Sequence, residues 1–347
     1  FRSIEHVKRY TTTGMGTDQG KLANMHALGI ISETAGVKMG SLGTTTFRPP
    51  YTPLTFGTIV GRNVGTFFDI IRKTPMHEWH LNHRAEFENV GQWKRAWYYP
   101  KDNESMHQAV QRESKAARES AGILDASTLG KIDIKGTDAS EFLNRVYTNS
   151  WSKLGIGKCR YGLMLNEDGM VYDDGVTTRL DENHYVMTTT TGGAANVLSK
   201  LEDYLQTEWP ELDVWLTSVT DQYATASVCG PNSKKILKKL FPNVEFNDEN
   251  FPHMSFKNAE MNGINCRIMR ISFTGEHSYE INIESKYGKS LWEKCMDVGK
   301  EYNITPYGTE TMHLLRAEKG FIIVGQDTDG TMTPIDLQMD WIVSKKK

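Results

Sequence analysis

Residues 166–180, NEDGMVYDDGVTTRL, place two carboxylates side by side in a segment with the pattern of a β-hairpin. Asp is a poor strand former, and adjacent residues of a strand point to opposite faces of the sheet. One of Asp173 and Asp174 must therefore point inward. It does so either as a paired structural group or as a functional one, and the remainder of the chain has to decide between these interpretations.

The register of this hairpin indicates which carboxylate points inward. A two-residue loop at Asp168-Gly169 makes six side chains share one face of the sheet. They form the facing pairs Leu163 with Asp174, Leu165 with Tyr172, and Tyr161 with Val176. Because this face is mostly apolar, we expect it to be the buried one, with Asp174 pointing inward.

On this register, Asp174 is a diagonal neighbour of Tyr161, within reach of a hydrogen bond. Burial of a carboxylate among apolar groups is costly and raises its pKa, so Asp174 could hold or accept a proton near neutral pH. A structural Asp bonded to backbone N–H groups or to a tyrosine is the alternative. Asp173 is expected on the opposite face, satisfied by water or by Arg179.

A second carboxylate stands out in TGEHSYEINI, residues 274–283. Tyr279, Ile281 and Ile283 alternate onto one face of a strand, which leaves Glu280 and Asn282 on the other. That other face is either a solvated edge or the position of a fixed carboxylate. Such a carboxylate could pair with two adjacent N–H donors of a heterocycle such as a pterin or guanine.

Composition excludes several classes of function. With 40 basic and 43 acidic residues, the net charge of −3 gives no electrostatic footprint for nucleic acid. The 347 residues suit about two domains, and no apolar run is long enough to span a membrane. The four cysteines form no CxxC pair, which predicts reduced thiols in a cytosolic protein.

The first 70 residues are rich in Gly and Thr and are expected to be dominated by loops, with one short helix from Lys21 to Thr34. The stretch GMGTDQGKL is not a phosphate-binding loop. Met15 stands where the Walker pattern needs Gly, and Leu22 stands where it needs Ser or Thr.

From residue 106 onward, helical and strand patterns follow one another. We expect a helix over 106–121 that stops at Gly122, a strand at KIDIKG, a helix at DASEFLNRVYTN and the hairpin discussed above. Strand, turn and helix then recur at 184–205 and 222–240, followed by a second hairpin at 266–285 and a helix at 288–303. This pattern predicts an α+β fold with antiparallel sheets flanked by helices.

Two further clusters, one of histidines and one of aromatic residues, could form binding sites. The run MHEWHLNH spaces His77, His80 and His83 three residues apart, which could ligate a metal. Because no acidic companion ligand stands out, we favour histidines that pack in the core or line a substrate site. The aromatic residues of GQWKRAWYYP could stack against a flat ring, although such clusters are more often core.

Several blocks resemble the aminomethyltransferase, or T-protein, family of the glycine cleavage system. They are GILDASTLGKIDIKGTDASEFLNRVYTN, YGLMLNEDGMVYDDGV, CGPNSKKIL, FTGEHSYEINI and RAEKGFIIVGQDTDGTMTPIDLQMDWIV, within roughly residues 85–347. Other stretches are similar to one branch, the α subunits of heterotetrameric sarcosine oxidases. They are FRSIEHVKRYTTTGMGTDQGK, GTTTFRPPYTP, PMHEWH, VGQWKRAWYYP and TTTTGGAA.

This resemblance implies a division of the chain near residue 70. Residues 1–70 would be the tail of an upstream oxidoreductase half with its connecting segment. Residues 71–347 would be an aminomethyltransferase-like folate-binding domain that lacks the family's C-terminal barrel.

The resemblance also implies site residues. Asp174 matches the essential Asp of the family, Tyr161 matches a tyrosine lining the folate site, and Glu280 matches the carboxylate that holds the pterin. Asp173 is expected to bind the cofactor together with Tyr161 and Glu280. TTTTGG stands where T-proteins have an Asn-containing stretch, and Met312 stands where many carry Arg, so both departures argue against the lipoyl-linked glycine-cleavage reaction.

The implied function is capture of a one-carbon unit by tetrahydrofolate. An imine or formaldehyde equivalent from oxidative demethylation of sarcosine would give 5,10-methylenetetrahydrofolate, with Asp174 accepting the released proton. FAD, FMN and NAD would belong to the full complex, and the partners would be a flavin-bearing β subunit and small γ and δ subunits. The alternatives are a stand-alone aminomethyltransferase or folate-dependent demethylase, and a non-catalytic assembly subunit.

Overall fold

The structure is a computed structural model that describes residues 3–15, 19–47, 52, 54–62, 65 and 70–345. The chain divides into two compact units, Phe1–Ile70 and Ile71–Lys347. None of the described helices is long and apolar enough to cross a membrane.

The first unit contains more helix than its Gly- and Thr-rich composition predicts. Its described residues form three α-helices and a 3-10 turn, and the expected helix is confirmed as α2 with slightly shifted ends. At the start of α1, the Ser3 hydroxyl accepts a hydrogen bond from the His6 amide, so a capping residue begins a helix that hydrophobic periodicity did not reveal. The elements are α1 (Ile4–Thr11), α2 (Ala23–Ala35), η1 (Met39–Ser41) and α3 (Phe56–Val60).

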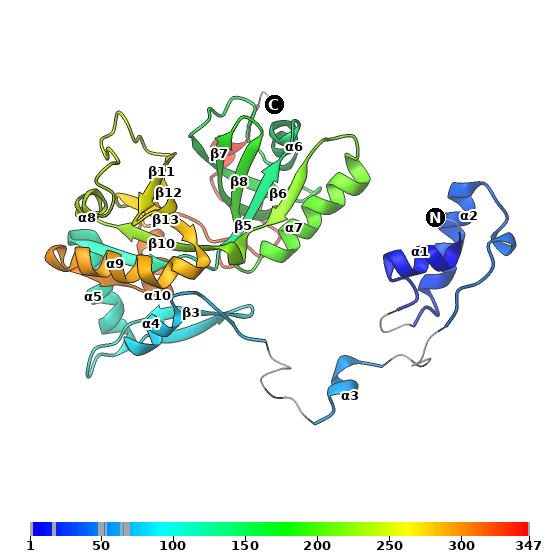
Figure 1. Cartoon of the computed structure of the whole chain (residues 1–347), viewed down its shortest axis with the longest axis horizontal. Helices are drawn as coiled ribbons and strands as arrows, with labels where there is room; N and C mark the ends of the chain where they lie inside the picture. Colours follow the sequence, from blue (N-terminus) through cyan, green and yellow to red (C-terminus); the bar gives the residue numbers. More distant parts are fainter. Residues whose placement is uncertain are drawn as a thin grey trace. The chain divides into compact units, whose positions relative to one another are not determined.

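The second unit is built on three sheets (Figure 1). A six-stranded sheet has the order β11-β12-β13-β10-β4-β14, a five-stranded sheet has the order β6-β7-β8-β5-β9, and a small sheet has the order β1-β3-β2. All pairs are antiparallel except β14 with β4 and β1 with β3. The predicted α+β class with antiparallel sheets is therefore confirmed, with a parallel strand added at two positions.

The strands of the six-stranded sheet are β4 (Ala121–Asp125), β10 (Tyr223–Cys229), β11 (Ser255–Met261), β12 (Ile264–Arg270), β13 (Ser278–Glu284) and β14 (Ile304–Pro306). Those of the five-stranded sheet are β5 (Gly130–Lys135), β6 (Cys159–Leu165), β7 (Val171–Asp181), β8 (His184–Thr189) and β9 (Trp215–Ser218). The small sheet consists of β1 (Arg72–Lys73), β2 (Glu86–Val90) and β3 (Trp93–Tyr98).

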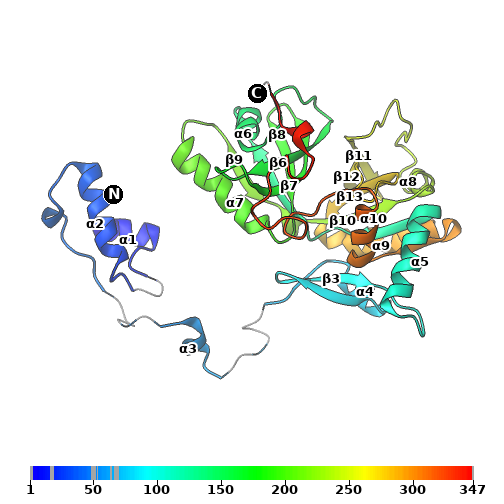
Figure 2. The same ribbon diagram turned by 180° about the vertical axis from the view of Figure 1, so that it is seen from behind.

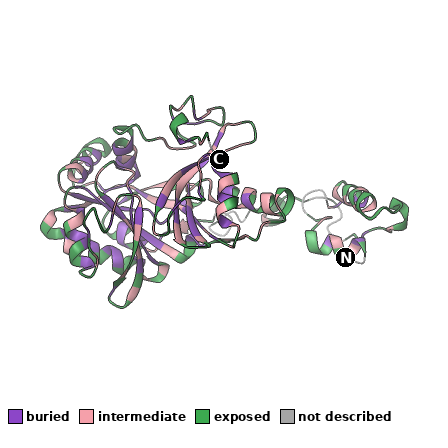
Figure 3. Cartoon of the chain, turned by 90° about the horizontal axis from the view of Figure 1, so that it is seen from above, coloured by how far each residue is buried: buried purple, intermediate pink, exposed green. Residues whose placement is uncertain are grey.

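Each large sheet buries one face under two helices. Many residues of the strands are buried, as the purple segments in Figure 3 show. Helices α8 (Ser233–Leu240) and α9 (Gly288–Gly299) pack on the six-stranded sheet in a first core cluster, which includes Ile236, Trp292 and Ile281. Helices α6 (Ala139–Val146) and α7 (Ala194–Asp203) pack on the five-stranded sheet in a second cluster, which includes Phe142 and Leu201. Burial of this apolar area is the main stabilising contribution of the fold.

The other faces of the two sheets turn toward each other. Cys159 and Val186 of the five-stranded sheet pack against Met269 and Ile271, which are on or directly after β12. The C-terminal segment after α10 (Thr309–Ala317) covers the hairpin of β6 and β7, where Met339 and other apolar side chains meet Leu163 (Figure 2). Apolar contacts therefore join the inner faces of the two sheets and the C-terminal segment.

Helix α5 (Met106–Glu119) confirms the predicted helix but ends two residues earlier than expected. Ser105 forms a capping box with Gln108 at its start. Gly122 does not end the helix, because it lies inside β4. A Cβ atom at this glycine would lie 2.8 Å from the ring of Tyr307, so close packing explains why glycine occupies the position.

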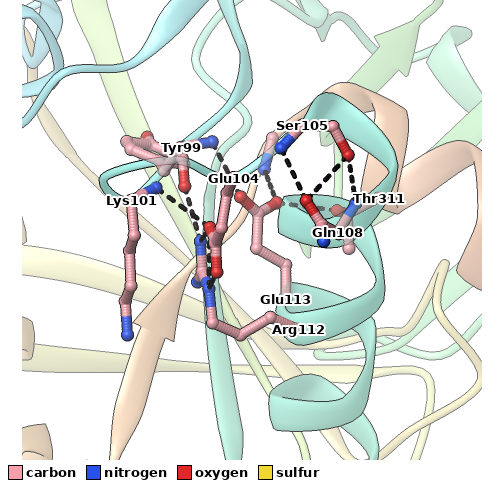
Figure 4. A network of polar contacts seen from close by, with 9 residues as sticks. Tyr99, Lys101, Glu104, Ser105, Gln108, Arg112, Glu113 and Thr311 are labelled. Carbon is pink, nitrogen blue, oxygen red and sulfur yellow. Dashed lines mark hydrogen bonds and ion pairs between the residues drawn. The ribbon is translucent and has the colours of Figure 1, made fainter.

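The buried carboxylate of Glu113 connects α5 to two other parts of the unit (Figure 4). One oxygen accepts a hydrogen bond from the Tyr99 amide at 2.7 Å. The other accepts from the Thr311 hydroxyl at 2.7 Å and from the Gly308 amide at 3.1 Å. Burial raises the pKa of Glu113, and these three donors oppose that rise.

We predict that Glu113→Ala lowers the free energy of unfolding by roughly 2–4 kcal/mol, because it leaves three buried donors without an acceptor. Urea unfolding followed by circular dichroism measures the loss. Glu119→Ala on the same helix is the matched control, since Glu119 is exposed and should change stability by less than about 0.5 kcal/mol. Equal losses in the two variants would contradict this account of the network.

Candidate functional site

The hairpin of β6 and β7 has the predicted register over most of its length. Leu163 pairs with Asp174, and Tyr161 pairs with Val176. Near the turn the prediction is wrong, because Leu165 pairs with Val171 across a β-bulge. The loop is longer than two residues and spans 166–170, and the bulge sends Tyr172 into the second core cluster instead of onto the Asp174 face.

Asp173 lies on the face opposite Asp174, as predicted, but the prediction that water or Arg179 satisfies it is wrong. Its side chain is only 2% exposed, and it receives hydrogen bonds from the amides of Asp174 at 2.9 Å and Thr190 at 3.3 Å. Arg179 donates elsewhere, to backbone carbonyls. The turn before α7 closes over Asp173, since a Cβ atom at Gly193 would lie 2.9 Å from its carboxylate. Burial raises the pKa of Asp173 to about 6.

Asp174 lies on the opposite face of β7, as predicted, and is hydrogen-bonded by Tyr161. The tyrosine hydroxyl donates to the carboxylate at 2.7 Å. Desolvation raises the pKa of Asp174 to about 7. The Tyr161 hydrogen bond opposes this rise, and the neighbouring Asp173 charge adds to it. The Asp173 carboxylate holds the Asp174 amide, so one carboxylate fixes the backbone from which the other projects.

The Asp174 face is the one that turns toward the six-stranded sheet. Met164, which pairs with Asp173, belongs to the second core cluster under α6 and α7. Val176, which lies two residues after Asp174 and therefore on its face, packs in the cluster with Met269 of β12. Asp174 therefore projects from the inner face of its sheet.

Glu280 projects from the inner face of the other sheet. It pairs with Met269 on β12 and with Ser227 on β10, so β13 is a central strand and the solvated-edge alternative is excluded. Its neighbours Tyr279 and Ile281 belong to the first core cluster on the outer face. Burial raises the pKa of Glu280 to about 7, and this carboxylate has no hydrogen bond or ion pair to any residue that the structure describes.

Lys131 is a charged group on these inner faces that the sequence analysis did not identify. It pairs with Thr188 on β8, and its neighbours Ile132 and Ile134 point into the second core cluster, so its side chain lies on the Asp174 face. The side chain is buried, and the ammonium donates to the carbonyls of Ser127 at 3.0 Å and Leu129 at 3.1 Å. The alternation in KIDIK was the available signal.

Lys131 and Glu280 influence each other electrostatically. Burial lowers the pKa of Lys131 to about 8, and the charge of Glu280 opposes that fall. Lys131 is in turn the group that opposes the rise in the pKa of Glu280. The two groups form no direct ion pair in the described part of the chain. The Glu280 carboxylate and the Lys131 ammonium therefore project from the inner faces of the two sheets without touching each other.

The three histidines do not converge. His80 is buried between the hydroxyl of Tyr99, 2.9 Å from its Nδ1, and the carboxylate of Asp125, 3.0 Å from its Nε2. His83 stacks on Trp79 with ring centroids 3.7 Å apart. His77 packs beside Phe87. These are packing and hydrogen-bonding roles, and the aromatic cluster around them contributes Trp93, Tyr99 and other side chains to the core.

A cleft of about 590 Å³ on the second unit contains none of the four predicted site residues, although Ser127, whose carbonyl accepts from Lys131, is part of its lining. Trp93, Tyr223, Lys73 and Lys286 are among the residues that line it. We place the candidate site between the two large sheets instead. The inner faces of these sheets carry a carboxylate with no partner among the described residues, a carboxylate paired with tyrosine and a buried ammonium. The volume of a cleft does not by itself indicate which ligand or reaction it could serve.

We predict that Asp174→Asn stabilises the protein at pH 8 by about 1–3 kcal/mol and has little effect at pH 4. The folded pKa of about 7 lies above the ordinary value of 3.8, so ionisation costs stability in full above pH 7, and this cost vanishes as pH falls to 4. Thermal unfolding at both pH values measures the difference. A variant that is less stable at pH 8 would contradict the assigned environment.

Comparison with known proteins follows the same division of the chain. The GCVT N-terminal domain family matches residues 76–347, and the sarcosine oxidase A3 domain family matches residues 1–62. The sarcosine oxidase subunit alpha of Corynebacterium sp. (strain U-96) is 56% identical over 100% of this chain and 36% of its own length. That of Rhizobium meliloti (strain 1021) is 45% identical over 100% of this chain and 35% of its own length.

The chain thus spans about a third of the length of these sarcosine oxidase relatives. The aminomethyltransferase of Chlorobium limicola is 30% identical over 80% of this chain and 73% of its own length. The crystal structure of glycine cleavage system aminomethyltransferase T from Bartonella henselae superposes with a TM-score of 0.69 at 25% identity, over 80% of this chain and 70% of that one. The chain therefore belongs to the aminomethyltransferase (GCVT) family.

Proposed function

We propose that this chain is the folate-binding part of a sarcosine oxidase α subunit. It would transfer the one-carbon unit from oxidative demethylation of sarcosine to tetrahydrofolate, giving 5,10-methylenetetrahydrofolate. The observation that carries this proposal is the position of Asp174. This carboxylate is held by Tyr161 at 2.7 Å on an inner sheet face and turns toward the sheet from which Glu280 projects.

The residues present suit a reduced folate. Its pterin ring offers two adjacent N–H donors, and the Glu280 carboxylate, which has no partner among the described residues, can accept both. Its amine nitrogens require a proton acceptor near the point of attack. Asp174 has a pKa of about 7 and can accept a proton at neutral pH.

Within this proposal the roles of the side chains follow from their environment. One folate amine attacks the carbon of the imine or formaldehyde equivalent, and Asp174 accepts the proton that this amine releases. The second folate amine then closes the methylene bridge as glycine leaves from the imine, or water from formaldehyde, and this leaving group takes up the proton. In its ionised form Asp174 also stabilises the positive charge of the iminium carbon. Tyr161 keeps the carboxylate oriented, and Asp173 acts as a positioning residue through the Asp174 amide. When Glu280 binds the pterin, the folate amine is held close to the one-carbon unit, which raises the effective concentration of the two reactants.

The oxidation of sarcosine is assigned in this proposal to other parts of the assembly. FAD, FMN and NAD would be bound outside this chain, by the upstream half and by a flavin-bearing β subunit, with small γ and δ subunits completing a hetero-oligomer. Residues 1–70 would be the tail of the upstream half with its connecting segment. Similarity to sarcosine oxidase α subunits over the whole chain supports this assignment.

Calorimetric titration with tetrahydrofolate tests the proposal. We expect Glu280→Gln to weaken binding by roughly 1–3 kcal/mol, the usual loss for a charged hydrogen-bond partner. Glu284→Gln is the matched control, because Glu284 is exposed at the end of the same strand. Asp174→Asn should bind tetrahydrofolate with nearly unchanged affinity but form methylenetetrahydrofolate from formaldehyde at least about 100-fold more slowly.

Two results would contradict the proposal. Wild-type protein that is folded and does not bind tetrahydrofolate would favour the non-catalytic assembly subunit. Equal binding by wild-type protein and Glu280→Gln would remove the assigned pterin contact.

A further inference from the structure

We propose that Lys131 is a specificity-determining residue of the inter-sheet site, where its ammonium donates a hydrogen bond to the 4-oxo group of the bound pterin. This inference rests on the proposed function, and it adds the chemical class of the ring that the site selects. The ligand would be a 2-amino-4-oxopteridine, and 2,4-diaminopteridines would be rejected.

Lys131 has the position that such a contact requires. It lies on the same face of the five-stranded sheet as Asp174 and Tyr161, which is the face that packs toward β12. Glu280 lies on the opposing face of the other sheet. A lysine that served only to solvate the protein would extend to water, as Lys135 does from the exposed end of the same strand.

Lys131 also retains hydrogen-bonding capacity. An ammonium group has three N–H donors. Two are used by the carbonyls of Ser127 and Leu129, and the third has no partner among the residues that the structure describes. Burial of an ammonium is costly, and Lys131 forms no ion pair with a carboxylate among the described residues. We therefore infer that its charge serves to bind a ligand.

Lys131 and Glu280 together complement one edge of the ring. The 2-amino-4-oxopteridine edge presents the 2-amino group and N3–H as donors, followed by the 4-oxo group as an acceptor. Glu280 supplies the acceptor for the two donors, and Lys131 supplies a donor for the oxygen beside them. In a 2,4-diaminopteridine the oxygen is replaced by an amino donor, which would face an ammonium and leave it unsatisfied.

Among the described residues, three titratable groups interact electrostatically with Glu280, and Lys131 is the cation among them. They are Lys131 from β5, Cys159 from β6 and Tyr307 after β14. Burial raises the pKa of Cys159 to about 12 and that of Tyr307 well above its ordinary value, so both are neutral at pH 7. Removal of the Lys131 charge therefore has a direct consequence for the ionisation of Glu280.

The test compares tetrahydrofolate with its 4-amino-4-deoxy counterpart, tetrahydroaminopterin, by calorimetry on wild-type protein, Lys131→Met and the control Lys135→Met. We expect Lys131→Met to weaken tetrahydrofolate binding about 10-fold or more and to affect tetrahydroaminopterin less, so the preference between the two falls by about 10-fold. Lys135→Met should change neither. The amino analogue also lacks N3–H, so the change in preference, rather than the preference itself, reports on Lys131.

The pH dependence of tetrahydrofolate binding is a second measurement, and replacement of a lysine with a purely structural role would not change it. Glu280 must be ionised to accept both pterin donors, and loss of the neighbouring cation raises its pKa. The decline in tetrahydrofolate affinity on acidification should therefore begin at higher pH in Lys131→Met than in wild-type protein. Lys131→Gln, which keeps a donor for the Ser127 carbonyl but carries no charge, should shift the decline in the same direction if Lys131→Met does not fold.

The outcomes separate this inference from the proposed function. Wild-type protein that binds tetrahydrofolate, with an unchanged preference and an unchanged pH midpoint in the Lys131 variants, would overturn the role of Lys131 and leave the folate site in place. Wild-type protein that does not bind tetrahydrofolate would overturn both. A reduced preference together with a raised midpoint supports the inference.

Discussion

The cost of removing ionised groups from water governs this structure. Two carboxylates, Asp174 and Glu280, and one ammonium, Lys131, lie between two β-sheets whose outer faces are sealed by helices. Desolvation is the largest cause of the altered pKa of each of these groups. Buried ionisable groups with altered pKa values are common at functional sites. Because these three groups include both signs of charge, they suit a polar heterocycle that carries both donors and acceptors.

The rest of the fold supports this arrangement. The helices keep the outer sheet faces apolar, and the contact of Cys159 and Val186 with Met269 joins the inner faces. The segment after α10 covers the hairpin at Leu163. Met312 packs with Leu124 and other side chains in a further apolar cluster, so the residue that departs from the T-protein pattern has a structural role here.

The hairpin register and the inward position of Asp174 could be predicted from the sequence, because strand alternation is strict and the turn was recognisable. The pairing of Tyr172 could not be predicted, since a bulge reverses the alternation near the turn. Asp173 was assigned to a wet face because the sequence does not show that the turn before α7 folds over it. Glu280 followed from alternation, but its position facing the other sheet depends on packing between sheets.

Contacts between residues that are distant in sequence also explain the other differences between the sequence-based predictions and the structure. Gly122 had the pattern of a helix stop, yet its role is to admit the ring of Tyr307, which is distant in sequence. Lys131 had a visible signal in KIDIK, but a lysine in an alternating strand usually faces water. Lys131 is buried on a sheet face that packs toward β12, whereas Lys135 is exposed at the end of the same strand.

A crystal structure of the protein with tetrahydrofolate would show directly where the folate binds. We expect density for the pterin between the two large sheets. The Glu280 carboxylate should lie about 3 Å from the 2-amino and N3 nitrogens, with the amine nitrogens of the folate directed toward Asp174. A folate bound in the cleft near Trp93 and Tyr223, with Glu280 still lacking a partner, would contradict the account.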